Sequence, residues 1–316
     1  MRQPPGFWPT SRLARLPGAL YLLSVLSLVL TVATPGFLTV TNLTNVGLQV
    51  AVLTIVALGM TLIILTEGID LSLGPVLGLA GVVMGLLAVG GYPLPVAVLA
   101  ALGVGALFGL LNGLLIAYVA VPAFVATLGT FGMAQSLAMV LTEGNSVTGL
   151  GPRIRWFNEG VLLGLPVPIW ATAALFAGTY VLLYRTRFGR YVFAIGGSRR
   201  ALQLAGVRVG VYQTAVYVYG GLLAAVAAFI MTARMNAAHP TIAIGLEFDA
   251  IAAVILGGTS FEGGRGGLVG TVVGALAVGV LRNGLNLLGL STEWQVATVG
   301  IVIISAIVLD ATRDLA

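Results

Sequence analysis

The chain lacks cysteine and lysine altogether, and it contains one histidine among its 316 residues. Without cysteine it has no disulfide bond, no thiol nucleophile and no cysteine metal ligand. The lone His239 excludes a histidine-rich cluster, so we predict no metal site. Without lysine the phosphate-binding loop GxxxxGK[ST] cannot be formed. We therefore predict a chain that is not an enzyme, has no ATPase site of that kind and binds no cofactor itself.

Charged residues are scarce as well. They make up 8% of the chain, whereas hydrophobic residues make up 59%, and soluble domains average roughly a quarter charged residues. A soluble domain is therefore excluded. The net charge of +5 comes wholly from arginine, and arginine-rich loops orient membrane proteins by staying on the cytoplasmic side. We interpret the charge as a topology signal and predict no nucleic-acid partner.

Long apolar runs recur along the whole chain, and each is close to the ~20 residues that cross a bilayer as a helix. They predict an all-α integral membrane protein with a single transmembrane domain, residues 1–316. A retained first span is favoured over a cleaved signal peptide, because many spans follow its basic amino-terminal segment. We predict ten spans, at residues 18–34, 46–66, 71–90, 94–118, 122–142, 163–184, 211–233, 246–260, 267–289 and 294–310.

The interval from Arg185 to Gly210 is the strongly charged part of the chain, with six arginines and no acidic residue. It predicts a cytoplasmic loop between spans six and seven, and with ten spans both termini are then cytoplasmic. Within this loop Ser198 is a suitable N-cap for a short helix that extends to Ala205, and Gly206 is suited to end it. Such a helix could contact a cytosolic partner.

A weak internal repeat relates two parts of the chain. Asp70 and Asp249 are each followed, seven and eight residues later, by a Leu-Gly pair, and further on by an Asn-Gly-Leu phrase that begins at Asn112 or Asn283. With ten spans, one copy begins on the inner side and the other on the outer side. This predicts an inverted-topology repeat in which spans two to five match spans seven to ten.

Polar residues within or beside the spans are costly unless they face protein or water, so they are candidates for lining a translocation path. A hydroxylated, uncharged solute would need such donors and acceptors in a wet path, whereas simple solvation of loops is the competing explanation. The candidates are Glu67, Asp70, Asn112, Glu247, Asp249, Asn283 and Asn286.

Three of these acidic residues have a second interpretation. Asp70, together with Ser72, is placed to cap the helix that begins span three. Glu247 and Asp249 are two residues apart and point to different faces of a helix, so one can line a cavity while the other pairs with an arginine. On the outer side we predict that Arg153, Arg155 and Arg234 meet acidic groups of a docking partner.

Several spaced motifs resemble the ribose-type permease family, the membrane subunits of bacterial ABC importers for ribose, galactose, xylose, autoinducer-2 and related solutes. The resemblance runs from about residue 45 to the end and does not specify a substrate. The motifs are MTLIILTEGIDLSLGPVLGLAG (60–81), PAFVATLGT (122–130), FGRYVFAIGGSRRALQLAGV (188–207), EFDAIAAVILGGTSFEGGRGG (247–267) and NGLNLLG (283–289).

The resemblance implies a type II permease, similar to the vitamin-B12 importer, that works by alternating access in a bacterial inner (plasma) membrane. It implies a second permease (identical or related), two cytosolic ATPase subunits that hold ATP and Mg, an extracytoplasmic solute-binding protein and a simple sugar. An ABC permease for nucleosides or branched-chain amino acids is the alternative. An ion-coupled secondary transporter would also show ten spans and an inverted repeat, but it would work without an ATPase.

The resemblance also implies that the charged interval holds the coupling helix, which rests on the ATPase. The usual Gly-Asn-x-x-Ala-Ala pattern is altered here at Ser198 and Leu202. We expect Leu202 and the Arg199-Arg200 pair to specify this permease's choice of ATPase. The coupling residues would be Gly197, Ser198, Arg199, Arg200, Ala201, Leu202 and Gly206.

Overall fold

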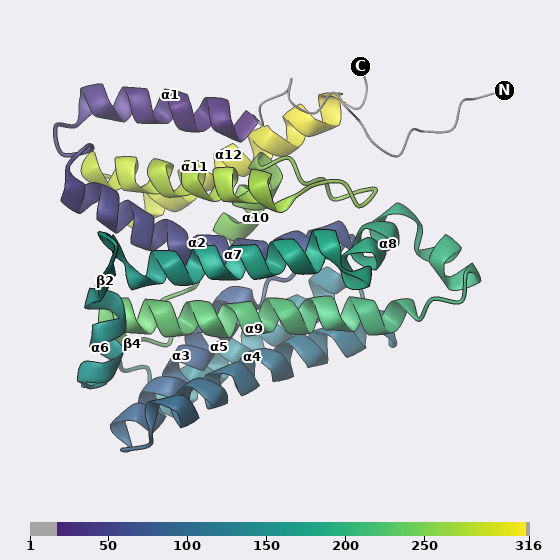
Figure 1. Ribbon diagram of the computed structural model, residues 1–316, viewed down its shortest axis with the longest axis horizontal. Coiled ribbons are helices and arrows are strands. Elements are labelled where there is room, and N and C mark those ends of the chain that lie inside the picture. The colour runs from purple at the N-terminus through teal and green to yellow at the C-terminus, as the bar shows by residue number, and fades with distance from the viewer. Residues whose placement is uncertain (1–17, 314–316) are drawn as a thin grey trace.

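A computed structural model describes residues 18–313 of the chain as a bundle of long helices that run roughly along one axis (Figure 1). The basic amino-terminal segment, with arginines at positions 2, 12 and 15, lies outside the described residues. Each of the ten predicted intervals contains a helix. These are α1 (Gly18–Ala33), α2 (Val40–Leu65), α3 (Leu73–Val89), α4 (Leu94–Ala117), α5 (Ala123–Thr142), α7 (Val167–Arg185), α9 (Val209–Met235), α10 (Leu246–Leu256), α11 (Leu268–Leu287) and α12 (Thr292–Arg313).

Six of the described helices are long and apolar enough to cross a membrane by length and composition. They are α2, α4, α5, α7, α9 and α11. Helices α1 and α3 are apolar but shorter. The most enclosed is α2, in which 94% of the most apolar window is buried inside the protein, so the bundle is built around it.

The predicted interval 246–260 is too long for its helix. Helix α10 has 11 residues and ends before Gly257 and Gly258, the second of which has a positive φ of 84°. At 1.5 Å per residue it spans roughly 16 Å, about half of a bilayer core. Non-helical segments precede both α3 and α10. The one before α3 is mostly buried, and irregular backbone is tolerated at membrane depth where protein surrounds it, whereas the one before α10 includes exposed residues such as Thr241 and Ile244.

One end of the bundle carries a short helix and two small strand pairs. Helix α6 (Pro152–Glu159) lies across the ends of the long helices, near β2 and β4 (Figure 1). Strands β1 (Val147–Thr148) and β4 (Ala237–Ala238) pair, as do β2 (Val161–Leu162) and β3 (Leu165–Pro166). The predicted start of span six at 163 is wrong, because Leu163 and Gly164 form the tip of the β2–β3 hairpin with positive φ angles of 51° and 80°.

The opposite end of the bundle carries α8, Arg187–Leu204 (Figure 1). The charged interval is therefore mostly helical: the short helix predicted after Ser198 is preceded by a helical part, from Arg187, that the sequence did not predict. Ser198 has extended backbone angles (φ −165°, ψ 96°) that divide α8 into two parts. The predicted cap is confirmed, because Ser198 Oγ accepts a hydrogen bond from the Ala201 N–H at 3.2 Å.

The predicted end of this short helix is confirmed too. Gly206 has a positive φ of 78°, which favours glycine. Its N–H donates to the Gln203 carbonyl at 3.0 Å, and the Val207 N–H donates to the Leu202 carbonyl at 3.0 Å. This pair of bonds is the Schellman motif that satisfies the last carbonyls of a helix.

Candidate functional site: an outer polar cavity

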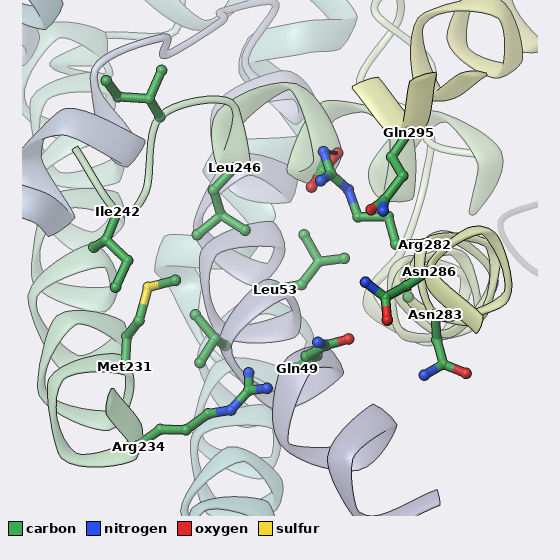
Figure 2. Close-up of a pocket in the computed structure, with 14 residues that line it drawn as sticks. Gln49, Leu53, Met231, Arg234, Ile242, Leu246, Arg282, Asn283, Asn286 and Gln295 are labelled. Atoms are coloured by element: carbon green, nitrogen blue, oxygen red, sulfur yellow. Dashed lines mark hydrogen bonds and ion pairs between the residues drawn. The ribbon is translucent and has the colours of Figure 1, made fainter. Parts of the chain in front are cut away.

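A polar cavity of about 300 Å³ lies among α2, α9, α10, α11 and α12 (Figure 2). It is beside the last two turns of α9 and the first turn of α10, so it belongs to the half of the bundle that carries β4, away from α8 (Figure 1). We call it the outer cavity because the predicted topology places α8 on the cytoplasmic side. Its polar lining residues are Gln49, Arg234, Asp249, Arg282, Asn283, Asn286 and Gln295.

An ion pair joins two walls of this outer cavity. Arg282 Nη2 of α11 lies 2.7 Å from Asp249 Oδ1 of α10, and their side chains are 27% and 6% exposed. Asp249 lies in the first turn of α10, where the helix dipole also favours a negative charge. Asp249 therefore both lines the cavity and pairs with an arginine. We had predicted that one of these roles would belong to Asp249 and the other to Glu247.

Arg234 gives the cavity a second positive charge. It lies near the end of α9 and is partly buried, and among the described residues it has no ion-pair partner. In Figure 2 its guanidinium and the amide of Gln49 extend from α9 and α2 into the space between the walls. With two arginines and one carboxylate, the cavity has a net positive charge.

Two cavity residues, Gln49 and Gln295, were missed by sequence reasoning because glutamine carries no charge. Gln49 did carry a signal, since it interrupts an apolar stretch, whereas Gln295 follows the polar residues 291–293. Gln295 is held in place by a hydrogen bond from its Nε2 to the Leu290 carbonyl at 3.0 Å. Together with Asn286, these two residues supply amide donors and acceptors around the space.

Asn283 lines the cavity, but its amide is already bound. Asn283 Nδ2 donates to Asn42 Oδ1 at 2.8 Å, and Asn42 Nδ2 donates back to Asn283 Oδ1 at 3.1 Å. Both residues are buried. The reciprocal pair fastens α11 to the first turn of α2 and leaves Asn286 as the freer amide of that helix.

Asp70 and Asn112 belong to a separate, fully enclosed cluster. Asp70 Oδ1 accepts hydrogen bonds from the N–H of Ser72 at 2.8 Å and from its hydroxyl at 2.6 Å. Asn112 Nδ2 donates to Ser72 Oγ at 2.9 Å, and Thr130 Oγ1 donates to Asn112 Oδ1 at 2.7 Å. The capping prediction is wrong in detail, because Ser72 occupies the N-cap position of α3 without a side-chain bond to its N–H groups.

Glu247 is also enclosed, with no exposed surface. Its Oε1 accepts a hydrogen bond from the Gly245 N–H at 3.0 Å, and its Oε2 has no partner among the described residues. The carboxylate lies against Gly74 in the first turn of α3, where any side chain would collide with it. Glu247 therefore joins the starts of the two short helices instead of facing the outer cavity.

The remaining candidates lie elsewhere. Glu67 lines a second cavity near α8. Arg155 is near Glu159 at 3.9 Å on the exposed face of α6, and the side chain of Arg153 is outside the part of the chain that the structure describes. Of the predicted coupling residues, Arg199 and Leu202 are partly buried, and the exposed ones are Gly197, Ser198, Arg200, Ala201 and Gly206.

A helical bundle in which six of the described helices are long enough to cross a membrane indicates a multi-pass membrane protein, and the polar cavity among them is a candidate site for a solute. The particular family follows from comparison with known proteins. The chain belongs to the family described as the branched-chain amino acid transport system permease component, whose profile matches residues 42–307. Members of this family are membrane permease subunits and are not themselves catalytic.

The curated relatives are named for the import or transport of ribose, D-allose and autoinducer 2. The chain is 43% identical to the ribose import permease protein RbsC of Escherichia coli K12, over 94% of each chain. It is 42% identical to RbsC of Bacillus subtilis 168, over 92% of this chain and 91% of the relative. It is 34% identical to the D-allose transport system permease protein AlsC of Escherichia coli K12, over 93% and 90%.

One solved structure shares the fold. It is described as an inward-facing conformation of a metal-chelate type ABC transporter, and it matches with a TM-score of 0.50 at 16% identity. The match covers 93% of this chain and 99% of the other. At this identity the likeness concerns the fold alone.

Proposed function

We propose that the chain is the membrane permease subunit of an ABC importer that translocates a simple sugar. The observation that carries this proposal is the 43% identity to a ribose import permease over 94% of both chains. Other relatives are named for D-allose transport and autoinducer-2 import, and both solutes fit the range that the sequence resemblance implies. A branched-chain amino acid, the solute in the family's description, is the alternative to be tested.

The importer would consist of this permease, a second permease, two cytosolic ATPase subunits that hold ATP and Mg, and an extracytoplasmic solute-binding protein. The exposed part of α8 after Ser198 would contact the ATPase, with Arg200 and Ala201 on its outer surface. Arg155 and Arg153 of α6 would meet acidic groups of the binding protein. Alternating access would then move the solute from the outer cavity to the cytoplasm of a bacterium.

Helix contacts support ten spans in an inverted repeat, as in type II permeases. If α2 to α5 correspond to α9 to α12, then the packing of α3 on α4 and α5 corresponds to that of α10 on α11 and α12. The packing of α4 on α9 likewise corresponds to that of α11 on α2. The two short helices, α3 and α10, are also equivalent in this scheme, and both follow irregular segments.

The lining of the outer cavity suits a polyhydroxylated solute. Gln49, Asn286 and Gln295 present amides that both donate and accept hydrogen bonds, as hydroxyl groups require. Arg234 adds charged donors from the opposite wall. A cavity of about 300 Å³ is at the lower end of the roughly 300–1,000 Å³ of small-molecule sites, which fits a monosaccharide.

The uptake of labelled D-ribose tests the proposal. We expect proteoliposomes that carry the permease, with its ATPase on the inner side and its loaded binding protein added outside, to import D-ribose only when ATP is inside with the ATPase. Excess unlabelled D-ribose should compete, whereas leucine should not. Uptake driven by a proton or sodium gradient without ATP would contradict the ABC mechanism, and competition by leucine alone would favour the amino-acid alternative.

The absence of cysteine provides a direct test of topology, because any introduced cysteine is the only thiol in the chain. Ser198 and Ser146 are both exposed and lie near opposite ends of the bundle. In intact cells we expect a membrane-impermeant maleimide to label Ser146→Cys and not Ser198→Cys. Permeabilised cells should show labelling of both, and the reverse pattern in intact cells would place α8 outside.

A further inference from the structure

A second cavity, of about 270 Å³, lies at the end of the bundle that carries α8. The end of α2, the connection from α4 to α5, helix α8 and the start of α9 form its walls. Its polar side chains come from three different elements, namely Glu67 after α2, Arg199 in α8 and Gln213 in α9. The inner cavity therefore lies where the kinked helix meets the membrane bundle.

The two consecutive arginines of α8 face different surroundings. Arg200 is exposed, whereas Arg199 is partly buried and lines the inner cavity. Arg199 Nη2 donates to the carbonyl of Ala117, the last residue of α4, at 3.5 Å. Carbonyls at a helix end lack intrahelical partners and attract a positive charge. Arg199 thus connects α8 to α4 and does not project toward a cytosolic partner.

Gly196 brings α8 equally close to the other half of the bundle. It packs against the carbonyl of Leu65, the last residue of α2, and a side chain at position 196 would lie 2.7 Å from the Gly264 Cα. Gly264 belongs to the glycine-rich turn between α10 and α11. Only glycine allows these three backbones to meet.

Glu67, two residues after the end of α2, also connects α2 to the α10–α11 turn. It has a positive φ of 61° because it occupies the C′ position after α2, where its N–H donates to the Ile64 carbonyl at 2.9 Å and the Gly68 N–H donates to the Ile63 carbonyl at 3.1 Å, as in a Schellman motif. Glu67 Oε1 accepts a hydrogen bond from the N–H of Gly263, in the α10–α11 turn, at 3.4 Å. The same side chain lines the inner cavity with Arg199.

Gln213 supplies an acceptor that this arrangement leaves unused. It is 4% exposed, and its Oε1 has no hydrogen-bond partner among the described residues. A buried acceptor without a donor is unfavourable. Arg199 is the charged donor that lines the same cavity as Gln213 and Glu67.

We propose that Arg199 and Glu67 form a coupling junction that passes movement of α8 to both halves of the permease. In one arrangement Arg199 binds the end of α4, and in the other it moves into the inner cavity toward Glu67 and Gln213. The ATPase would bias this choice by displacing α8. Arg199 is thus a positioning residue inside the permease, in contrast to Arg200 on its outer surface. The inference rests on the proposed function as an ABC permease.

The reconstituted importer tests the junction through the amount of D-ribose imported per ATP hydrolysed. We expect Arg199→Gln to co-purify with the ATPase and to hydrolyse ATP, while this ratio falls by about tenfold, within the usual range of coupling between sites. Arg199→Lys keeps the charge and should retain most of the coupling. Arg190→Gln removes an exposed charge from the same helix and should couple as the natural protein does.

Normal coupling in Arg199→Gln, beside an active natural complex, would overturn the junction and leave the proposed function intact. Loss of ATPase co-purification would overturn it as well, by making Arg199 a contact of the ATPase. An inactive natural complex that is folded and fully assembled would instead count against the proposed function. If Arg199→Gln does not fold, Glu67→Gln carries the same test with the same expected ratio.

Discussion

A leucine in place of Gly109 should leave almost no folded permease in the membrane. Gly109 faces α9 so closely that a side-chain carbon there would meet the backbone of Tyr217 and lie 2.7 Å from the Val218 Cα. Backbone atoms cannot rotate away as a side chain can, so the two helices would have to separate. Overpacking costs up to about 3 kcal/mol even where side chains adjust, and membrane helices depend on such close contacts.

The measurement is the yield of a monodisperse peak in detergent size-exclusion chromatography, and Gly103→Leu is the matched control. Gly103 lies in the same helix, is exposed, and has no atom within 4 Å of the position that a side chain would take. Its leucine variant should give close to the natural yield. Equal yields for the two variants would show that α4 and α9 do not cross at Gly109.

Local signals were the ones that could be predicted from the sequence. Apolar runs located a helix in each of ten intervals, and Ser198 and Gly206 predicted both ends of a short helix correctly because a cap and a left-handed glycine act within a few residues. The first half of α8 was missed. Its residues 187–197 contain three glycines and several aromatic or β-branched residues, which are weak helix formers, and packing of Gly196 on α2 and the α10–α11 turn stabilises the helix there.

The partners of the polar residues could not be predicted, because they come from distant parts of the chain. The cost of burial singled out Asp70 and Asp249. The neighbour Ser72 binds Asp70 at 2.6 Å, but the further partner Asn112 is 42 residues away, and the partner of Asp249, Arg282, is 33 residues away. The repeat matched Asn112 to Asn283, and even so the first binds the Asp70 cluster while the second binds Asn42. Which of two adjacent arginines faces inward likewise depends on where α8 packs.

Replacing Arg282 with alanine should both destabilise the permease and abolish uptake. The change leaves the Asp249 carboxylate, whose side chain is 6% exposed, without its cation. Breaking a buried ion pair by removing one partner costs about 3–5 kcal/mol. The outer cavity would also lose one of its two positive charges and the link between α10 and α11. A lowered thermal unfolding midpoint in detergent, together with loss of D-ribose uptake, is the expected result.

A double variant separates the two effects. Asp249→Asn with Arg282→Met removes both charges, and because no buried charge is then left unpaired, stability should recover most of what Arg282→Ala loses. Uptake should stay low, since the cavity has lost the same polar groups.

Arg155→Ala provides the stability comparison, because its 3.9 Å contact with Glu159 is between exposed side chains, where such pairs contribute about 0–1 kcal/mol. If Arg282→Ala proved as stable as Arg155→Ala, Asp249 would have to find water or another donor in the cavity, and the pair would not be what holds α10 to α11. Recovery of uptake in the stabilised double variant would show that the pair serves the fold and not the path of the solute.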